Sequence, residues 1–205
     1  MMISFKAIAV LPLLAAGGAT AFSLSMSSAL IVQNKGGGHG ELGYQLAKNL
    51  QSNPKITSIT ILQDKACNDA KEPFVSYATD IPNVEVIKAD LADETMTAAD
   101  MQALLKQQSF DYVWDNASKG AVGAGKAVID SAKEWDSKLL TYVSSAGCYQ
   151  PNDIFPMPET TPVKESAGQV QYEKYGEYIV ILSFLIVVYT CLARVAKRLS
   201  LYVSD

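Results

Sequence analysis

The sequence predicts an α/β protein built on a doubly wound parallel sheet, and three observations predict it. Short apolar runs alternate with stretches of helical spacing between residues 29 and 147, which is typical of strands joined by crossover helices. A glycine-rich loop follows the first run, and polar side chains follow the others. Because ligands of parallel sheets bind beyond the carboxyl ends of the strands, these polar ends predict a binding edge.

Five apolar runs are the expected strands, and each is short enough to be buried in a parallel sheet. They cover residues 29–32, 56–62, 84–87, 112–114 and 139–143. The expected helices have apolar residues at helical spacing and cover residues 42–50, 97–107 and 121–135. Asn53 and Pro54 end the first helix, and Thr97 is a candidate N-cap of the second.

Composition limits the number of domains and the kinds of partner. With 205 residues, of which 49% are apolar, the chain has enough material for one domain with a hydrophobic core. Its net charge of -4 argues against a protein that binds nucleic acid through a basic surface. The three cysteines form no CxxC pair and His39 is the single histidine, so we expect no metal site.

The glycine loop carries the first functional prediction. Gly37, Gly40 and Gly43 follow the first strand and open a helix, which is the context that a dinucleotide-binding loop requires. Such glycines allow a tight turn, a close approach of the backbone to the pyrophosphate, and close packing of helix on strand. The sequence therefore predicts a Rossmann-type domain over residues 29–177 that binds NAD or NADP. The alternative is a glycine-rich turn that merely packs.

The choice between NAD and NADP stays open at the end of the second strand. Asp64 lies 21 residues after Gly43, where an acid accepts hydrogen bonds from the adenosine ribose and favours NAD. A solvated loop aspartate explains the residue equally well. Lys65, its neighbour, is also suited to pair with the 2′-phosphate of NADP.

Both ends of the chain lie outside the predicted domain. Residues 1–21 combine Lys6, a short apolar stretch and a small-residue cleavage site, as in a signal peptide. Residues 22–28 are serine-rich and free of acids, and Phe22 after the cleavage site resembles the junction used for secondary plastids. We therefore expect delivery to a chloroplast, with the secretory pathway as the alternative.

The C-terminal segment, residues 178–198, is apolar with a basic flank. Residues 178–193 contain no charged side chain, and Arg194, Lys197 and Arg198 follow. The stretch is just short of the usual length for crossing a bilayer. Three interpretations stand side by side: a membrane anchor, a buried helix or strand of the domain, and a misassigned continuation of the gene.

Several residues resemble the cofactor and catalytic positions of short-chain dehydrogenases/reductases. By that resemblance Asp90 would contact adenine and Asn116 would line the cofactor cleft, although either is also explained as a strand-end cap. The resemblance also gives Ser144 or Ser145 as the serine that polarises the substrate, and Lys174 as the lysine of a Tyr-x-x-x-Lys pair. The tyrosine position of that pair holds Val170. Because the phenol is missing, we do not expect the usual acid–base chemistry of the superfamily, and Ser144, Ser145 and Lys174 would be vestigial.

Two nearby tyrosines do not restore the pair. Tyr172 precedes Lys174 by two residues and Tyr175 follows it by one. On a helix each therefore projects in a different direction from a residue four positions before the lysine.

Four segments together resemble a narrower family, the chloroplast stem-loop-binding proteins, which are atypical short-chain dehydrogenase/reductase relatives. The resemblance lies in residues 37–40, 115–119, 144–151 and 167–175, including the valine in the tyrosine position. It implies binding of plastid RNA, RNA endonuclease activity and association with ribosomes. The family continues well beyond this chain's apolar tail, so the resemblance also implies a truncated C-terminus.

The sequence thus predicts a plastid RNA-binding or RNA-processing protein on an NAD(P)-binding Rossmann scaffold, with the cofactor structural or vestigial. The alternative is an NAD(P)-dependent epimerase/dehydratase or reductase that acts on a nucleotide-sugar-like substrate. A third hypothesis is a non-catalytic, cofactor-sensing partner protein that is tethered to a membrane through residues 178–193.

Overall fold

A six-stranded, fully parallel sheet forms the centre of the protein, in the order β3-β2-β1-β4-β5-β6. The computed structural model describes residues 27–33, 38–68, 70–71, 75, 80–81, 83–150, 161–176 and 181–185. The order reverses direction beside β1, as in the doubly wound fold whose halves each bind a mononucleotide. The predicted Rossmann-type fold is therefore confirmed.

The first five strands and helices α1, α3 and α4 follow one another as the sequence predicts. The strands are β1 (Ser27–Gln33), β2 (Ile56–Asp64), β3 (Val84–Ala89), β4 (Tyr112–Asn116), β5 (Leu139–Ser144) and β6 (Ile181–Leu185). The helices are α1 (Gly38–Gln51), α3 (Ala98–Leu104), α4 (Gly123–Glu134) and α5 (Gly168–Tyr175), with a short 3-10 helix at Ala146–Cys148. Thr97 caps α3 in a capping box with Asp100, as its position in the sequence predicts.

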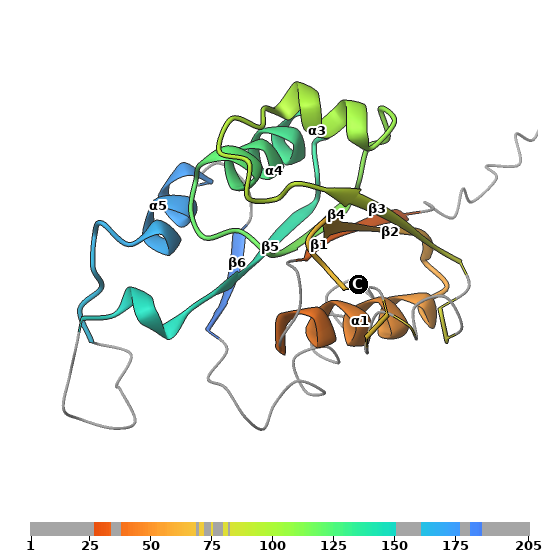
Figure 1. Cartoon of the computed structure of the whole chain (residues 1–205), viewed down its shortest axis with the longest axis horizontal. Coiled ribbons are helices and arrows are strands. Elements are labelled where there is room, and N and C mark those ends of the chain that lie inside the picture. The colour runs from red at the N-terminus through yellow and green to blue at the C-terminus, as the bar shows by residue number, and fades with distance from the viewer. Residues whose placement is uncertain are drawn as a thin grey trace, which may run out of the picture.

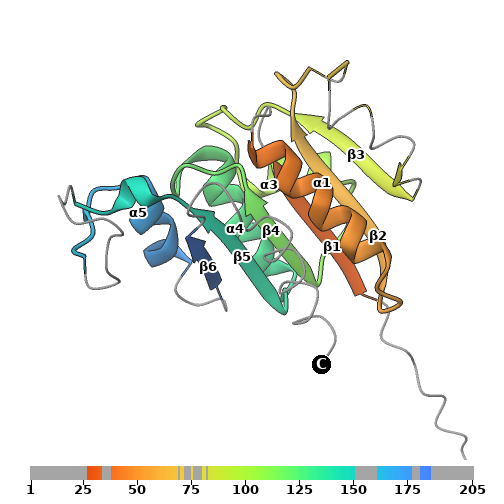
Figure 2. The same cartoon turned by 90° about the horizontal axis from the view of Figure 1, so that it is seen from below.

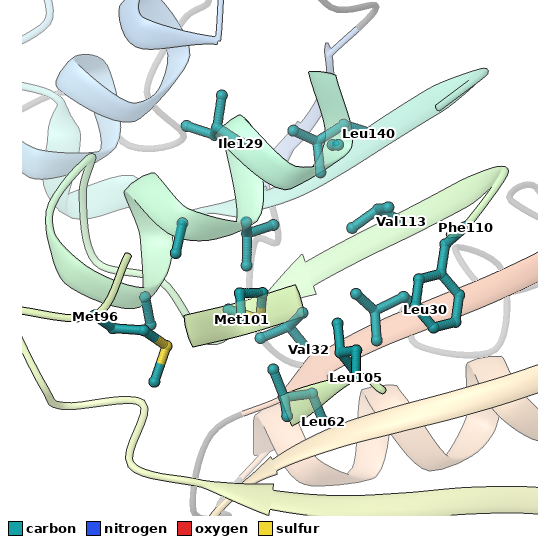
Figure 3. Close-up of a cluster of buried hydrophobic side chains, with 14 of the residues drawn as sticks. Leu30, Val32, Leu62, Met96, Met101, Leu105, Phe110, Val113, Ile129 and Leu140 are labelled. Carbon is teal, nitrogen blue, oxygen red and sulfur yellow. The ribbon is translucent and has the colours of Figure 1, made fainter. Parts of the chain in front are cut away.

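Helices cover both faces of the sheet and bury a core on each. Figure 1 shows α1 on one face and α3 and α4 on the other. The larger core lies under α3 and α4, where Met101, Leu105 and Ile129 meet Leu30 and Val113 of the sheet (Figure 3). The smaller core lies under α1 and includes Leu46, Ala47 and Leu50. Burial on both faces explains the continuous apolar run of β1, whereas the edge strand β3 is partly exposed and contains Glu85.

The sixth strand comes from the apolar C-terminal segment. Ile181–Leu185 pairs in parallel with β5, with Leu140 beside Ile181 and Ser144 beside Leu185. For these five residues the structure agrees with the strand interpretation. Within the described part of the chain, no helix has the length and apolar character needed to cross a membrane. The predicted signal and transit segments, residues 1–21 and most of 22–28, lie outside the described residues, as do 186–198 of the tail.

Candidate functional site: the carboxyl edge of the sheet

The register of the strands brings most of the predicted site residues to one edge. Gln33 at the end of β1 lies between Gln63 of β2 and Asn116 of β4, and Asp64 pairs with Ala89 at the end of β3. Figure 2 shows the strands running side by side in this order. This edge follows from parallel pairing, because every strand then ends on the same side.

The start of α1 packs directly against the end of β1 at Gly43. A Cβ atom on Gly43 would lie 1.8 Å from Oε1 and 3.0 Å from Cδ of Gln33. Gln33 is fully buried, and its Nε2 donates to Oε1 of Gln63 at 3.5 Å. Gly43 thus allows α1 to pack closely on β1, which the predicted dinucleotide loop requires of its last glycine. Gly40 lies in the first turn of α1, and Gly37 lies outside the described residues.

Charged side chains meet where β2 and β3 end. Asp64 is 9% exposed and its Oδ1 accepts the amide of Ala66 at 2.8 Å. The next residue, Lys65, places its Nζ 2.5 Å from Oδ2 of Asp90, which follows β3. The ion pair holds the pKa of Asp90 below its ordinary value. Both aspartates predicted to contact the adenosine therefore lie at adjacent strand ends.

The ends of β4 and β5 carry the neutral polar residues. Asn116 is 5% exposed and Ser144 is 6% exposed, and each is the last residue of its strand. Within the described residues, Oγ of Ser144 has no hydrogen-bond partner. Oγ of Ser145, which is exposed, accepts the amide of Gly147 at 3.2 Å. Because buried hydroxyl groups are normally paired, Ser144 is the better candidate of the two serines for a ligand contact.

Lys174 lies on α5 and reaches away from the protein interior. Its ammonium pairs with the carboxylate of Glu165, which is itself exposed. Together with Lys119 and Tyr175 it lines a cavity of about 570 Å³ between α5 and the loop that follows β4. Val170, one turn earlier, is 8% exposed. Lys174 is thus accessible, and an aliphatic side chain lies at the position where its phenol partner would stand.

A buried hydrogen-bond network that the sequence analysis did not predict fixes α5 to the end of β4. Asp115 is fully buried, and its carboxylate accepts bonds from the amides of Ala117 and Ser118 at 3.0 and 2.9 Å. The hydroxyl of Ser118 donates to it at 2.5 Å, and the hydroxyl of Tyr172 donates at 2.8 Å. The ring of Tyr172 stacks on Tyr142 of β5 with centroids 3.9 Å apart.

The network excludes Tyr172 as a general acid near neutral pH. Burial raises the pKa of Tyr172 well above its ordinary value, and the neighbouring Asp115 carboxylate raises it further. A phenol that exchanges protons at neutral pH needs the opposite shift. Tyr175 is also engaged, since its hydroxyl donates to Oδ1 of Asp130 at 2.8 Å. The structure thus agrees with the sequence in giving neither tyrosine the missing role.

The sequence contains one sign of this network, an acidic residue in a buried strand, but it does not identify the hydrogen-bond donors. Asp115 is an acid near the end of a buried strand, and a buried carboxylate requires hydrogen-bond donors. Its partner Tyr172 lies 57 positions away, so no local pattern connects the two. Among the described residues, no group of three or more His, Cys, Asp or Glu side chains is arranged to hold a metal ion.

The strand order defines a Rossmann-type fold in which α1 packs closely on β1 at Gly43. No protein-family model and no curated protein matches the chain. Solved structures do match it, at identities that show the fold alone.

Three of these structures are of enzymes with bound NAD. The Bordetella bronchiseptica enzyme WbmH in complex with NAD+ has a TM-score of 0.58 at 18% identity, over 78% of this chain and 56% of that one. WbmG from the same organism, in complex with NAD, has a TM-score of 0.56 at 16% identity, over 87% and 61%. A Stenotrophomonas maltophila UDP-glucose-4-epimerase with bound NAD and formylated UDP-arabinopyranose has a TM-score of 0.50 at 18% identity, over 77% and 52%.

The neighbours named here are thus enzymes solved with bound NAD, and one of them is a UDP-glucose-4-epimerase. The chain spans a little over half the length of these neighbours. Their likeness does not show membership of the chloroplast stem-loop-binding family, which stays a prediction from the sequence.

Proposed function

We propose that this chain is an NAD(P)-dependent epimerase/dehydratase-type protein whose second ligand is a nucleotide sugar. The observation that carries the proposal is the strand order β3-β2-β1-β4-β5-β6 together with the packing of Gly43 against Gln33. That packing brings the start of α1 onto the end of β1, where the helix amides favour a pyrophosphate. Enzymes with the same fold have been solved with NAD, and one of them also with a UDP-sugar.

The residues at the carboxyl edge fit a bound dinucleotide. A side chain at Gly43 would displace the buried end of the Gln33 side chain between α1 and β1. Asp64 and Asp90 would lie at the adenosine end. Asn116 and the unpaired, buried hydroxyl of Ser144 would lie at the other end, where the strand order continues into β4 and β5. When bound, NAD(P) supplies a group that accepts or donates hydride, and the residues of this chain bind and orient the two ligands.

Val170 limits proton transfer in this function, because valine has no hydroxyl group to exchange a proton with the substrate. With valine in the tyrosine position, the hydroxyl of Ser144 remains to donate a hydrogen bond to a substrate oxygen. Lys174 would bind a ribose hydroxyl once its ammonium leaves Glu165. We therefore expect slow turnover in the natural sequence and faster turnover when a phenol is restored four residues before Lys174.

Isothermal titration calorimetry with NAD+, NADP+ and UDP-glucose tests the binding part of the proposal. We expect one of the two dinucleotides to bind at micromolar concentration. UDP-glucose should bind more tightly when that dinucleotide is present, because both ligands would share the carboxyl edge. Absence of binding by both dinucleotides would contradict the proposal.

The chemical part is tested by Val170→Tyr in an epimerase assay that follows UDP-sugars by NMR. A positioned general acid–base contributes about a hundredfold or more, so we expect a gain of that order over the natural chain. Val170→Phe is the matched control, since it adds the same ring without the hydroxyl. An equal effect of both substitutions would show that the ring, and not the proton, matters.

The comparisons favour this function over plastid RNA binding, which is the first expectation from the sequence. None of the neighbours named above is described as binding RNA. RNA binding, ribosome association and delivery to a plastid therefore stay predictions that rest on the sequence resemblance.

A further inference from the structure

We propose that the ion pair between Lys65 and Asp90 makes the adenosine end of the site select NAD over NADP. The inference rests on the proposed function, because it concerns the same dinucleotide site. Neither the sequence pattern at Asp64 nor the comparisons decide between the two cofactors. The side-chain arrangement at the ends of β2 and β3 does provide a physical basis for the choice.

The ion pair bridges two neighbouring strands at the edge where the adenosine ribose would lie. Lys65 follows β2 and Asp90 follows β3, and these strands are adjacent in Figure 2. The backbone fixes the two residues relative to each other, since the amide of Lys65 donates to the carbonyl of Ala89 at 2.7 Å. Their side chains meet at 2.5 Å between Nζ and Oδ2. The turn after β3 is held by Oδ1 of Asp90, which accepts the amide of Ala92 at 3.2 Å.

The charges around Lys65 are unfavourable for an additional anion. Three carboxylates act on its ammonium: Asp90 by direct contact, and Asp64 and Asp93 through space. The 2′-phosphate of NADP carries close to two negative charges at neutral pH. It would have to displace Asp90 from Lys65 and then lie beside the displaced carboxylate. The hydroxyl groups of the NAD ribose carry no charge and can donate to Asp64 instead.

The ammonium of Lys65 is chemically suited to a phosphate, but in the structure it is already paired with the carboxylate of Asp90. On sequence alone it is as good a reason to expect NADP as Asp64 is to expect NAD. The pair with Asp90 removes that ambiguity, because a neutralised ammonium offers little attraction to a phosphate. Removing the charge of Asp90 should release Lys65 and move the preference towards NADP.

Calorimetric titration of NAD+ and NADP+ into the full chain and into Asp90→Asn tests the proposal. Asparagine keeps the acceptor for Ala92 and removes the charge. We expect the natural chain to prefer NAD+. In Asp90→Asn the ratio of the NADP+ to the NAD+ dissociation constant should fall roughly fivefold, the size expected for one charge a few ångströms away in water. Lys65→Met added to Asp90→Asn should restore the ratio, whereas Lys65→Met alone should raise it, because the carboxylate of Asp90 is then unpaired beside the 2′-phosphate.

Glu85→Gln is the matched control. Glu85 lies near the start of β3, the strand that Asp90 follows, and its Oε1 lies 2.6 Å from Nζ of Lys106. Removing this charge should leave the ratio unchanged, and circular dichroism melting verifies that each variant folds. An unchanged ratio in Asp90→Asn, or tighter binding of NADP+ by the natural chain, overturns the selectivity inference and leaves the proposed function standing. Failure of the natural chain to bind either dinucleotide overturns both.

Discussion

At the scale of single residues, the environment of Asp115 depends on a donor from a distant part of the chain. Its carboxylate is fully buried, and burial raises its pKa despite the hydrogen bonds from Ser118, Ala117 and Tyr172 that oppose the shift. Four donors satisfy it, and one of them comes from α5. Because a buried charge without donors is costly, each donor has a measurable effect on stability.

Removal of the Tyr172 hydroxyl tests this. Tyr172→Phe keeps the ring that stacks on Tyr142 and removes one donor to a buried carboxylate. We expect the free energy of unfolding in urea to fall by about 1.5–3 kcal/mol, as for hydrogen bonds to charged groups. Tyr142→Phe is the control, because its hydroxyl donates to the neutral carbonyl of Ser118 at 3.1 Å. That variant should lose about 0.5–1.5 kcal/mol, and equal losses would contradict the assignment.

A second residue, Asp111, joins three strands at the amino edge of the sheet. It precedes β4, accepts the amide of Ser28 in β1 at 2.9 Å, and pairs with Lys138 before β5 at 2.9 Å. Burial alone would raise its pKa, but the bonds from Lys138 and Ser28 outweigh this and lower it. A lowered pKa in the folded state stabilises the protein above the pKa of the unfolded chain. That stabilisation is lost as the pH falls through the folded value.

We therefore expect a pH-dependent difference between the natural chain and Asp111→Asn. Near pH 7 the variant should be about 1–2 kcal/mol less stable, allowing for the partial exposure of the pair. The difference should shrink as the pH falls below about 4. Urea unfolding at several pH values measures it. A difference that stays constant from about pH 7 to about pH 3 would show that the charge of Asp111 is not the cause.

At the scale of elements, helix α5 is positioned by backbone contact as well as by Tyr172. A Cβ atom on Gly168, the first residue of α5, would lie 2.0 Å from the carbonyl oxygen of Lys119 and 3.3 Å from Cα of Gly120. Backbone atoms cannot move away as the end of a long side chain can. The small residues at this contact therefore determine how closely α5, which carries Lys174, approaches the loop after β4.

Gly168→Ala should push α5 away from that loop. Overpacking of this kind costs about 1–3 kcal/mol, which thermal or urea unfolding measures. The affinity for the preferred dinucleotide should fall as well, because Lys174 moves with the helix. Gly147→Ala is the matched control, since a Cβ there meets Oγ of Ser145 at an ordinary 3.5 Å. Similar losses for both variants would mean that the contact with Lys119 has no special role.

At the scale of the whole molecule, the sequence predicts the sheet better than the site. Each of the five predicted runs agrees with a strand of the structure within a few residues, and the run of β1 is continuous and apolar because both faces of that strand are buried. The strand ends that hold Asp64, Asp90 and Ser144 follow from the same signal. The contacts of Tyr172 with Asp115 and of Lys65 with Asp90 join residues far apart in the chain. Side-chain geometry decides those contacts, and local pattern does not encode it.

Strand β6 is a whole element that the local sequence pattern does not predict. Its apolar segment fits an anchor, a helix or a strand equally well, because a continuous apolar run has no period that separates them. Pairing with β5 distinguishes the strand for Ile181–Leu185. That pairing depends on the exposed edge of β5, which only the assembled sheet provides.

The melting temperature of the whole molecule distinguishes dinucleotide binding from RNA binding, because a ligand that binds the folded chain stabilises all of it. At about 100 times its dissociation constant a ligand adds about 2.7 kcal/mol, which raises the melting temperature of a chain of this size by about 5–10 °C. We expect this shift with the preferred dinucleotide, and little dependence on salt beyond the pyrophosphate contacts. A plastid stem-loop RNA should give no comparable shift, because the chain carries a net charge of -4. A shift with RNA that disappears between low and physiological salt, with none from either dinucleotide, would instead favour the RNA-binding function.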